Sequence, residues 1–169
     1  MALPDRFDLI RRPDRAQQRD NKAVSSDNTA LPESLATWLQ TRHQTILVTI
    51  KKDGSPQSSN VAFAFDGTAA YVSVTAGRAK THNLRRDPRG LLHVPGDHFG
   101  QYASVPVLAT LGPVSVEPGD QAGQDLLALY NTLSETPHPD PDDFYAAMVS
   151  DRRLRLTLTP TGGRGYGIG

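Results

Sequence analysis

Residues 71–89, YVSVTAGRAKTHNLRRDPR, decide how the rest of this sequence is interpreted. Alternating β-branched positions predict a strand, Gly77 allows a turn, and a short helix then runs until Pro88 ends it. A helix N-terminus offers unpaired N–H donors and a partial positive charge, so cations in the first turn are unfavourable unless an anion is bound. Because Arg78 and Lys80 both fall there, we expect this corner to hold the phosphate of a cofactor.

The remaining cations of this stretch have a simpler interpretation. Arg85, Arg86 and Arg89 lie at the far end of the predicted helix, where the helix dipole favours positive charge. They are therefore predicted to be helix-end and surface charges. A basic helix taken by itself is commonly a solvated face, and that alternative stays open here.

The chain before the corner has the pattern of consecutive antiparallel strands. Residues 45–50, 57–65 and 70–75 are rich in β-branched and aromatic side chains. Asp53-Gly54 and Asp66-Gly67 are tight-turn pairs that would join them. Two successive hairpins make a meander, which is the usual start of a small barrel.

The rest of the chain adds further strands and peripheral helices. Helices are predicted at 31–42, 119–132 and 142–149, and strands at 90–94, 101–116 (one or two) and 153–159. The order is not an alternation of strand and helix. A mainly β fold follows, an antiparallel barrel of about six or seven strands with three or four peripheral helices.

Three regions are expected along the chain. Residues 1–29 are polar and charged and predict a partly disordered N-terminal arm, or alternatively an arm that lies across a partner subunit. Residues 30–160 form the cofactor-binding domain. Residues 161–169 form a glycine-rich C-terminal tail, expected to be a weakly ordered extension.

Composition narrows the classes of function. Among 169 residues, 18 are basic and 18 acidic, so no net charge favours nucleic acid or an anionic membrane. The absence of cysteine excludes disulfides, thiolate metal sites and a cysteine nucleophile. No apolar run approaches the roughly 20 residues of a membrane span. A soluble, cytoplasmic protein is expected.

Other catalytic and binding patterns are missing from the sequence. No Gly-x-Ser-x-Gly elbow, Gly-x-Gly-x-x-Gly loop or Walker loop is present. His93 and His98 are five residues apart across a Pro-Gly turn, and the sequence has no His-x-x-x-His pair and no clustered carboxylate pair with ligand spacing. No metal site is predicted, and the corner around Arg78 and Lys80 remains the strongest candidate site.

Several segments of the sequence resemble those of a known family. The segments concerned are Arg78-Ala-Lys80-Thr81-x-Asn83-Leu84-Arg85-Arg86-Asp87-Pro88-Arg89, Thr49-Ile-x-x-Asp53-Gly-x-Pro56-Gln-x-Ser59-Asn60-Val61, Ser73-Val74 and Ala147-Met148-Val149-x-Asp151-Arg152-Arg153. They are similar, in this order, to proteins of the pyridoxamine 5′-phosphate oxidase-like split-barrel superfamily. Within it, they resemble the actinobacterial branch that uses the deazaflavin coenzyme F420.

The resemblance implies a homodimer of split barrels with two cofactor sites at the dimer interface. It assigns the phosphate to Arg78, Lys80 and Thr81, and contacts along the neighbouring strand to Ser73, Val74 and Thr75. The tricyclic ring would lie on Ser59, Asn60 and Val61, and Gln101 or Tyr102 would reach the site from the second subunit. No catalytic side chain is identified, because the cofactor would supply the hydride.

Three functions remain open from the sequence. The first is F420-dependent reduction of an activated double bond in a small organic substrate. The second is an oxidase or reductase that uses flavin mononucleotide (FMN) at the same corner. The third is non-catalytic binding of a cofactor or tetrapyrrole. Vitamin B6 oxidation itself is disfavoured, because the last strand ends Leu158-Thr-Pro160 without the Arg-Leu-x-Pro type motif that grips the pyridoxal substrate.

Overall fold

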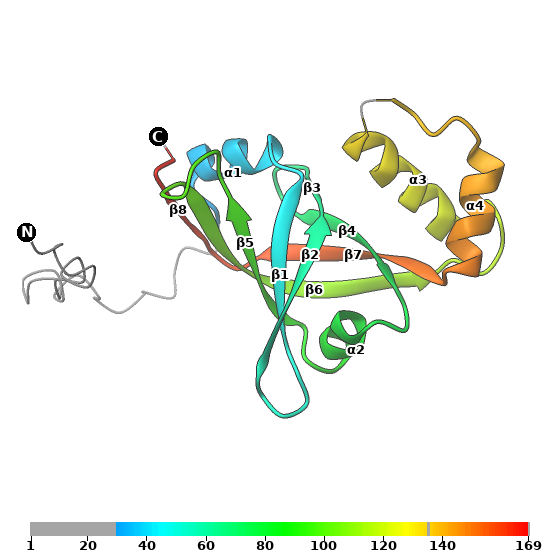
Figure 1. Cartoon of the computed structure of the whole chain (residues 1–169), viewed down its shortest axis with the longest axis horizontal. Helices are drawn as coiled ribbons and strands as arrows, with labels where there is room; N and C mark the ends of the chain where they lie inside the picture. The colour runs from blue at the N-terminus through cyan, green and yellow to red at the C-terminus, as the bar shows by residue number, and fades with distance from the viewer. Residues whose placement is uncertain (1–29, 135, 169) are drawn as a thin grey trace, which may run out of the picture.

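The structure of the chain, a computed structural model, describes residues 30–134 and 136–168. The predicted arm at residues 1–29 lies outside the described residues. Within the described part, the elements are α1 (Glu33–Gln40), β1 (Gln44–Ile50), β2 (Pro56–Ala62), β3 (Ala64–Phe65), β4 (Ala70–Thr75), α2 (Ala79–Arg86), β5 (Arg89–Pro95), β6 (Tyr102–Val114), α3 (Gln121–Leu133), α4 (Pro141–Ser150), β7 (Arg153–Pro160) and β8 (Arg164–Tyr166) (Figure 1). The expected class, mainly β with peripheral helices, is confirmed.

The strands form one antiparallel sheet that curls into a split barrel (Figure 1). Its hydrogen-bonded order is β2-β1-β5-β6-β7-β4-β3, and β8 pairs separately with β6. The strands β2 and β3 stand at opposite ends of this order, yet only Phe63 separates them in the chain. The sheet must therefore curl to bring its two ends together, and Phe63 is completely buried at that junction.

The predicted tight turns close the first two hairpins. Gly54 and Gly67 have φ angles of 82° and 100°, a left-handed conformation that glycine adopts without a steric penalty. Asp53 and Asp66 precede them, and each carboxylate accepts hydrogen bonds from backbone amides of its own turn. These local interactions fix the register of the β1–β2 and β3–β4 pairs.

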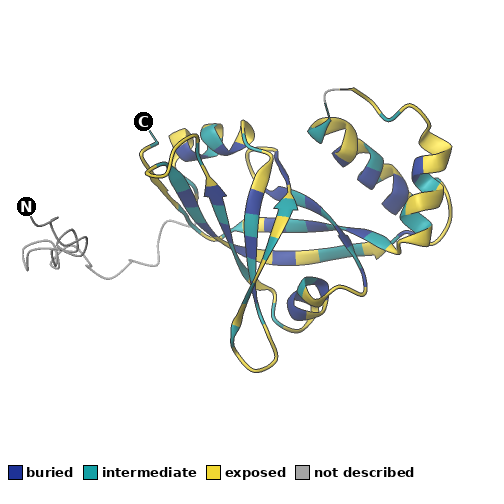
Figure 2. Ribbon diagram, in the orientation of Figure 1, coloured by how far each residue is buried: buried dark blue, intermediate teal, exposed yellow. Residues whose placement is uncertain are grey.

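Alternation along the strands builds the core. Buried residues alternate with half-buried or exposed ones along β4, β6 and β7, so one side chain in two points into the barrel (Figure 2). The core is dominated by aliphatic side chains, among them Leu47, Val72, Leu92, Val105 and Leu156. Leu35 and Leu39 of α1 cover one end of this core, and Trp38 packs against it as expected.

The structure has more strands than the six or seven expected, because two are very short. The first is β3, with two residues, and the second is β8, with three. The sequence predicts a weakly ordered extension after residue 160, and the structure instead pairs Arg164–Tyr166 with the start of β6. Gly162, with φ of 139°, lets the chain bend after Thr161 and resume a strand on the same neighbour.

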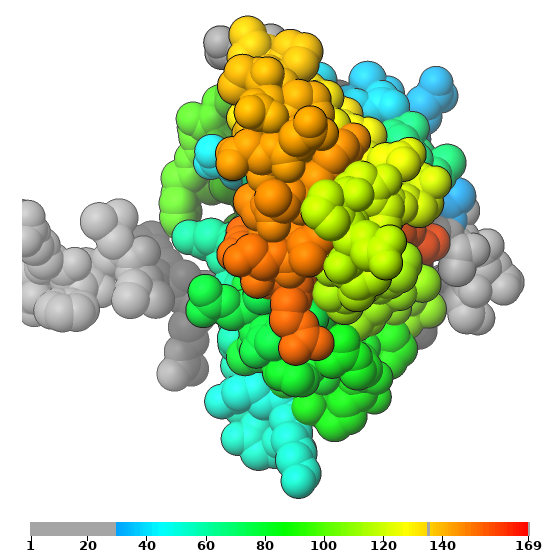
Figure 3. Space-filling view, turned by 90° about the vertical axis from the view of Figure 1, so that its right-hand side faces the viewer, coloured from blue at the N-terminus to red at the C-terminus, as the bar shows by residue number. Residues whose placement is uncertain are grey.

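Two helices cover the outer face of the sheet at one end. In Figure 3, α3 and α4 lie in the upper part of the face turned to the viewer, with α2 below them. Helix α3 packs on β7 and β4, and α4 packs on α3 and β7. The Ala76 amide donates to the carbonyl of Arg152, so the start of β7 lies beside the connection from β4 to α2. None of the helices in the described residues is both long and apolar enough to cross a membrane.

Asp120 fixes the start of α3. Its carboxylate accepts four hydrogen bonds, from the amides of Val116, Glu117 and Gly123 and from the hydroxyl of Ser115. These bonds, led by those from Val116 and Gly123, lower the pKa of Asp120 to about 2. The carboxylate thus contributes stability only while it is ionised.

Replacing Asp120 by alanine is expected to lower the free energy of unfolding by about 1–2 kcal/mol at pH 7, because the N-cap of α3 is lost. The pKa is lower in the folded state than in the unfolded state, so this contribution is complete above about pH 4 and disappears as the pH falls toward 2. Urea unfolding of both proteins at several pH values measures it. The exposed neighbour Glu117, replaced by alanine, serves as the control, and an equal Asp120→Ala deficit at pH 7 and pH 2 would contradict the assignment.

Candidate anion-binding site

The connection from β4 to α2 is a tight, well-bonded corner. Thr75 ends the strand, and its carbonyl accepts hydrogen bonds from the Arg78 amide (3.2 Å) and the Thr81 hydroxyl (2.8 Å). The Ala76 amide donates to the carbonyl of Arg152 at 3.0 Å, which ties the corner to the start of β7. Local bonds therefore set the direction in which α2 begins.

The first turn of α2 lacks the groups that normally stabilise a helix N-terminus. Arg78 occupies the N-cap position without a capping hydrogen bond from its side chain, and no acidic residue lies in the first turn. The amides of Ala79 and Lys80 belong to this turn, where no earlier helical carbonyl can accept from them. The arrangement leaves N–H donors and a positive dipole end available to an anion.

A third cation joins Arg78 and Lys80 at the corner. Arg153, the first residue of β7, pairs in register with Thr75, so the two side chains leave the sheet on the same face. Its Nη1 lies 3.4 Å from the Ser73 hydroxyl, and its Nε lies 3.2 Å from the Asp151 carboxylate. The corner thus combines charge from α2 with charge from a strand far along the chain.

The surroundings of Lys80 disfavour its positive charge. Burial lowers its pKa most, and the positive charges of Arg78 and Arg153 lower it further. Among the ion pairs of the described residues, none involves Arg78 or Lys80. A phosphate would offset this repulsion and accept hydrogen bonds from the same cations, so the donor set fits a phosphate group.

Thr81 has a different position from the one expected of a phosphate ligand. Its side chain is fully buried, its hydroxyl donates to the carbonyl of Thr75, and its amide bonds to the carbonyl of Arg78 at 3.0 Å. Both of its donors are therefore used inside the protein. In this structure Thr81 shapes the corner that presents Arg78 and Lys80.

The β4 residues predicted to contact the cofactor point to opposite faces of the sheet, because side chains alternate along a strand. Val74 points into the core, so only its backbone could face a ligand, and that backbone is paired with Leu154. Ser73 and Thr75 point outward and are half-buried. The structure thus brings Ser73 and Thr75 together with Arg78, Lys80 and Arg153.

Strand β2 carries the residues predicted to lie under a ring. Asn60 is exposed, while Ser59 and Val61 are half-buried on the other face. A hollow of about 450 Å³ opens at this end of β2, lined by Gln44, Thr45, Ile46, Asn60, Val61, Ala62 and Pro95. The hollow provides a surface for a flat ligand at Asn60 and Val61.

Gln101 is not near the corner within one chain. It lies between β5 and β6, at the end of the barrel away from α2 (Figure 1). Its side chain accepts from the Asp97 amide at 2.9 Å and donates to the Gly167 carbonyl at 3.2 Å. The residue ties the β5–β6 loop to the segment that follows β8, and its predicted contact would have to be made across a dimer interface.

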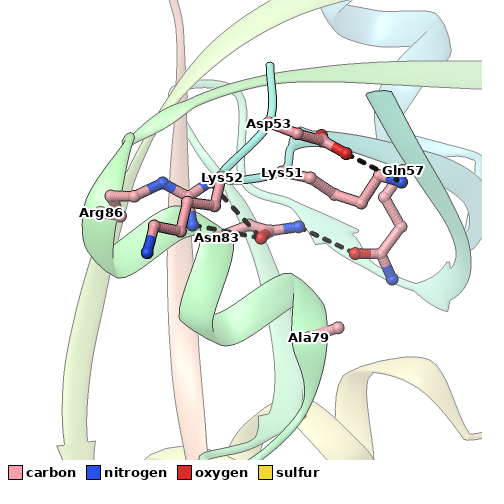
Figure 4. Close-up of a pocket in the computed structure, with 7 residues that line it drawn as sticks. All are labelled: Lys51, Lys52, Asp53, Gln57, Ala79, Asn83 and Arg86. Carbon is pink, nitrogen blue, oxygen red and sulfur yellow. Dashed lines mark hydrogen bonds and ion pairs between the residues drawn. The ribbon is translucent and has the colours of Figure 1, made fainter. Parts of the chain in front are cut away.

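A larger hollow of about 620 Å³ lies on the other side of α2, facing the tip of the β1–β2 hairpin. Figure 4 shows Asn83 at its base, with the amide nitrogen directed at Gln57. Asn83 is buried and donates at 2.8 Å to Gln57 and at 3.0 Å to the hydroxyl of Thr49. Arg86 also donates, to the carbonyl of Ile50. This network fixes α2 against the hairpin and so positions the corner.

Two residues of the site carry roles that the sequence interpretation did not assign. Arg153 was part of a matching segment, but its place beside Thr75 depends on the pairing of β4 with β7. Asn83 was likewise part of the pattern, and its role depends on the packing of α2 on β1 and β2. Arg85, Arg86 and Arg89 are exposed, as expected of helix-end charges.

Comparison with known proteins gives a family and a set of related folds. The pyridoxamine 5′-phosphate oxidase family matches residues 31–160 of the chain. A solved F420 reductase is 23% identical, with a TM-score of 0.57, over 79% of this chain and 98% of its own. A conserved hypothetical protein of Mycobacterium tuberculosis is 19% identical, with a TM-score of 0.64, over 85% of this chain and 89% of its own.

The related folds also include a protein of a different class. The heme storage protein HutZ of Vibrio cholerae is 15% identical, with a TM-score of 0.59, over 83% of this chain and 97% of its own. At these identities the likeness concerns the fold alone, and the fold accommodates both reductases and heme-binding proteins.

Proposed function

Since the chain belongs to the pyridoxamine 5′-phosphate oxidase family, we propose that it is an oxidoreductase whose cofactor is coenzyme F420. It transfers a hydride to an activated double bond of a small organic substrate. The observation that carries the proposal is the corner at the start of α2, where Lys80 is crowded by two arginines and has no carboxylate partner among the described residues.

The chain's own residues would hold the cofactor in two places. Arg78, Lys80 and Arg153 would bind the phosphate, with Ser73 and Thr75 of β4 beside them. Ser59, Asn60 and Val61 of β2 would contact the ring. Binding at two separated places fixes the orientation of a long ligand as well as its position.

When bound, coenzyme F420 supplies the hydride, so no side chain has to act as a nucleophile. The protein's part is to orient the ring and to exclude water from the face where the substrate lies. The cationic corner also stabilises negative charge on the ligand, most strongly at the half-buried Lys80, because charges interact more strongly away from bulk water.

FMN is the alternative cofactor, because it also carries a phosphate on the side chain of a similar three-ring system. The preference for F420 rests on the resemblance of the segment from Arg78 to Arg89 to the F420-dependent branch. It is supported by the likeness of the fold to a solved F420 reductase. Heme storage has less support, since no histidine of the chain falls in a motif identified as a heme ligand.

We also propose that the protein acts as a homodimer through the outer face of β1, β5 and β6. The outward side chains at the centre of this face are aliphatic: Ile46, Val48, Ile50, Leu91 and Leu108. Arg89 is the one Lys, Arg, Asp or Glu side chain on these three strands, and it pairs with Asp87. Two identical faces of this kind can meet without repulsion between like charges.

Titration of the purified protein with F420, FMN and heme, followed by fluorescence quenching or absorbance, tests the cofactor assignment. We expect F420 to bind most tightly, with an affinity that falls as the salt concentration rises, because the phosphate contact is partly exposed. If FMN bound more tightly than F420, FMN would be the cofactor. Binding of heme alone would reject the oxidoreductase assignment.

A further inference from the structure

We propose that Asp151 is a positioning residue of the phosphate corner, where it orients the guanidinium of Arg153 without touching the ligand. This role rests on the proposed function, since it concerns how the same corner recognises a phosphate. A carboxylate so close to an anion site would be expected to weaken binding through repulsion of like charges. The contacts of Asp151 favour the opposite effect.

The guanidinium of Arg153 is held at two of its nitrogen atoms. Its Nε donates to the Asp151 carboxylate at 3.2 Å, and its Nη1 donates to the Ser73 hydroxyl at 3.4 Å. The Ser73 contact is long, so the carboxylate is the stronger of the two partners. Among the hydrogen bonds of the described residues, none uses Nη2 of Arg153. Because the group is planar and rigid, holding its other nitrogens also directs the free donors of Nη2.

The turn that carries Asp151 is fixed by backbone hydrogen bonds. Asp151 follows the last residue of α4, and its amide donates to the carbonyl of Ala147 at 2.9 Å. Arg152 has a φ angle of 52°, a left-handed conformation that is unfavourable for a residue other than glycine. Its amide donates to the carbonyl of Val149 and its carbonyl accepts from the amide of Ala76, both at 3.0 Å. These bonds hold the unfavourable conformation in place.

The fixed turn keeps the two charged side chains together at the corner. Only Asp151 and Arg152 connect α4 to β7, so the carboxylate lies at the end of the helix and the guanidinium at the start of the strand. Arg153 pairs in register with Thr75, the last residue of β4. The position of α4 therefore determines where the Arg153 side chain is held beside the phosphate corner.

Arg153 needs such a partner because the corner without a ligand contains three cations. The charges of Arg78 and Arg153 both lower the pKa of Lys80, so these groups lie close enough to repel one another. Arg153 has a long side chain with many rotamers and could turn away from the other two cations. Its bond to Asp151 offsets the repulsion and holds the guanidinium in place before the ligand arrives. Such preorganisation reduces the entropy lost on binding.

The exposure of the pair limits its other possible effects. The side chains of Arg153 and Asp151 are 34% and 54% exposed. An ion pair this accessible contributes little to the stability of the fold, because solvent and salt screen it. The same screening weakens the repulsion between the carboxylate and a phosphate. The direction of the Arg153 donors is not weakened in this way, so orientation is expected to outweigh repulsion.

Two replacements of Asp151 separate orientation from charge. Asp151→Asn keeps an oxygen that can accept from Nε of Arg153 but loses the negative charge, whereas Asp151→Ala loses both. The measured quantity is the preference for F420 over its phosphate-free deazaflavin core, and for FMN over riboflavin. We expect Asp151→Ala to reduce this preference by roughly two- to fivefold, and Asp151→Asn to retain most of it. A carboxylate that only repelled the phosphate would give the opposite sign, with a raised preference in both variants.

The same measurement in an Arg153→Ala background tests whether Asp151 acts through Arg153. There, adding Asp151→Ala should change the preference no further. An equal effect with and without Arg153 would overturn the inference, as would an unchanged or raised preference in Asp151→Ala alone. Asp143→Ala is the matched control, because it removes an exposed carboxylate from the first turn of the same helix. If the wild type itself showed no preference for phosphorylated ligands, the proposed function would fail instead.

Discussion

Replacing Lys80 by alanine is expected to weaken binding of the phosphorylated cofactor by roughly ten- to a hundredfold. The side chain sits at the start of α2, half-buried, with Arg78 and Arg153 close enough to lower its pKa. A charge-assisted hydrogen bond to a phosphate contributes about 1.5–3 kcal/mol. Because Lys80 has no carboxylate partner among the described residues, its removal should not expose a new unpaired charge.

Arg85→Ala is the matched control for this measurement. Arg85 is an exposed cation of the same helix, at the end where the dipole favours positive charge. Its removal should change the affinity less than threefold at moderate salt, since exposed charges are largely screened. Equal losses from Lys80→Ala and Arg85→Ala would mean that the helix attracts anions through its overall charge and has no specific site.

The second large effect is expected at Asn83, whose replacement by alanine should lower the free energy of unfolding by about 2–3 kcal/mol. The amide of Asn83 donates to Thr49 and Gln57, and its loss leaves the buried hydroxyl of Thr49 without that donor. For a domain of this size the melting temperature should fall by roughly 5–10 °C. Thermal unfolding followed by circular dichroism measures the difference.

The neighbouring change His82→Ala provides the comparison, because His82 is exposed on the same helix. It should leave the melting temperature within about 2 °C of the wild type. Since Asn83 holds α2 against β1 and β2, Asn83→Ala should also weaken cofactor binding, although it does not face the phosphate corner. A variant that kept its stability would show that α2 is held by other contacts.

The fold was predictable where local chemistry determines it. Asp53-Gly54 and Asp66-Gly67 require tight turns, and both turns were found where expected. The single strand expected over residues 57–65 was wrong: it is interrupted at Phe63, so β2 and β3 lie at opposite ends of the sheet and the two hairpins do not form one meander. The pairing of distant strands could not be predicted from the sequence, because the alternating pattern of β7 is compatible with any neighbouring strand that has an apolar face. The tail was misjudged for a related reason, since glycines at 162 and 163 signal flexibility in a sequence but here allow a bend into β8.

The site was predictable to the same extent. Two cations in the first turn of a helix lie next to the positive end of its dipole, which is unfavourable. That unfavourable placement identified Arg78 and Lys80 from the sequence. Arg153 reaches the corner only through the register of β4 with β7, which no local pattern encodes. Thr81 carried the right spacing for a ligand, but its hydroxyl bonds to the strand that precedes it.

The central claim is that the corner at Arg78 and Lys80 binds a cofactor phosphate. The most direct measurement compares the affinity of one ring system with and without its phosphate, F420 against its phosphate-free deazaflavin core and FMN against riboflavin. We expect the wild type to prefer the phosphorylated form by at least about tenfold. That preference should fall to near unity in the Arg78→Ala, Lys80→Ala double variant. Equal binding of the phosphorylated and phosphate-free forms by the wild-type protein would contradict the claim that this corner binds a phosphate.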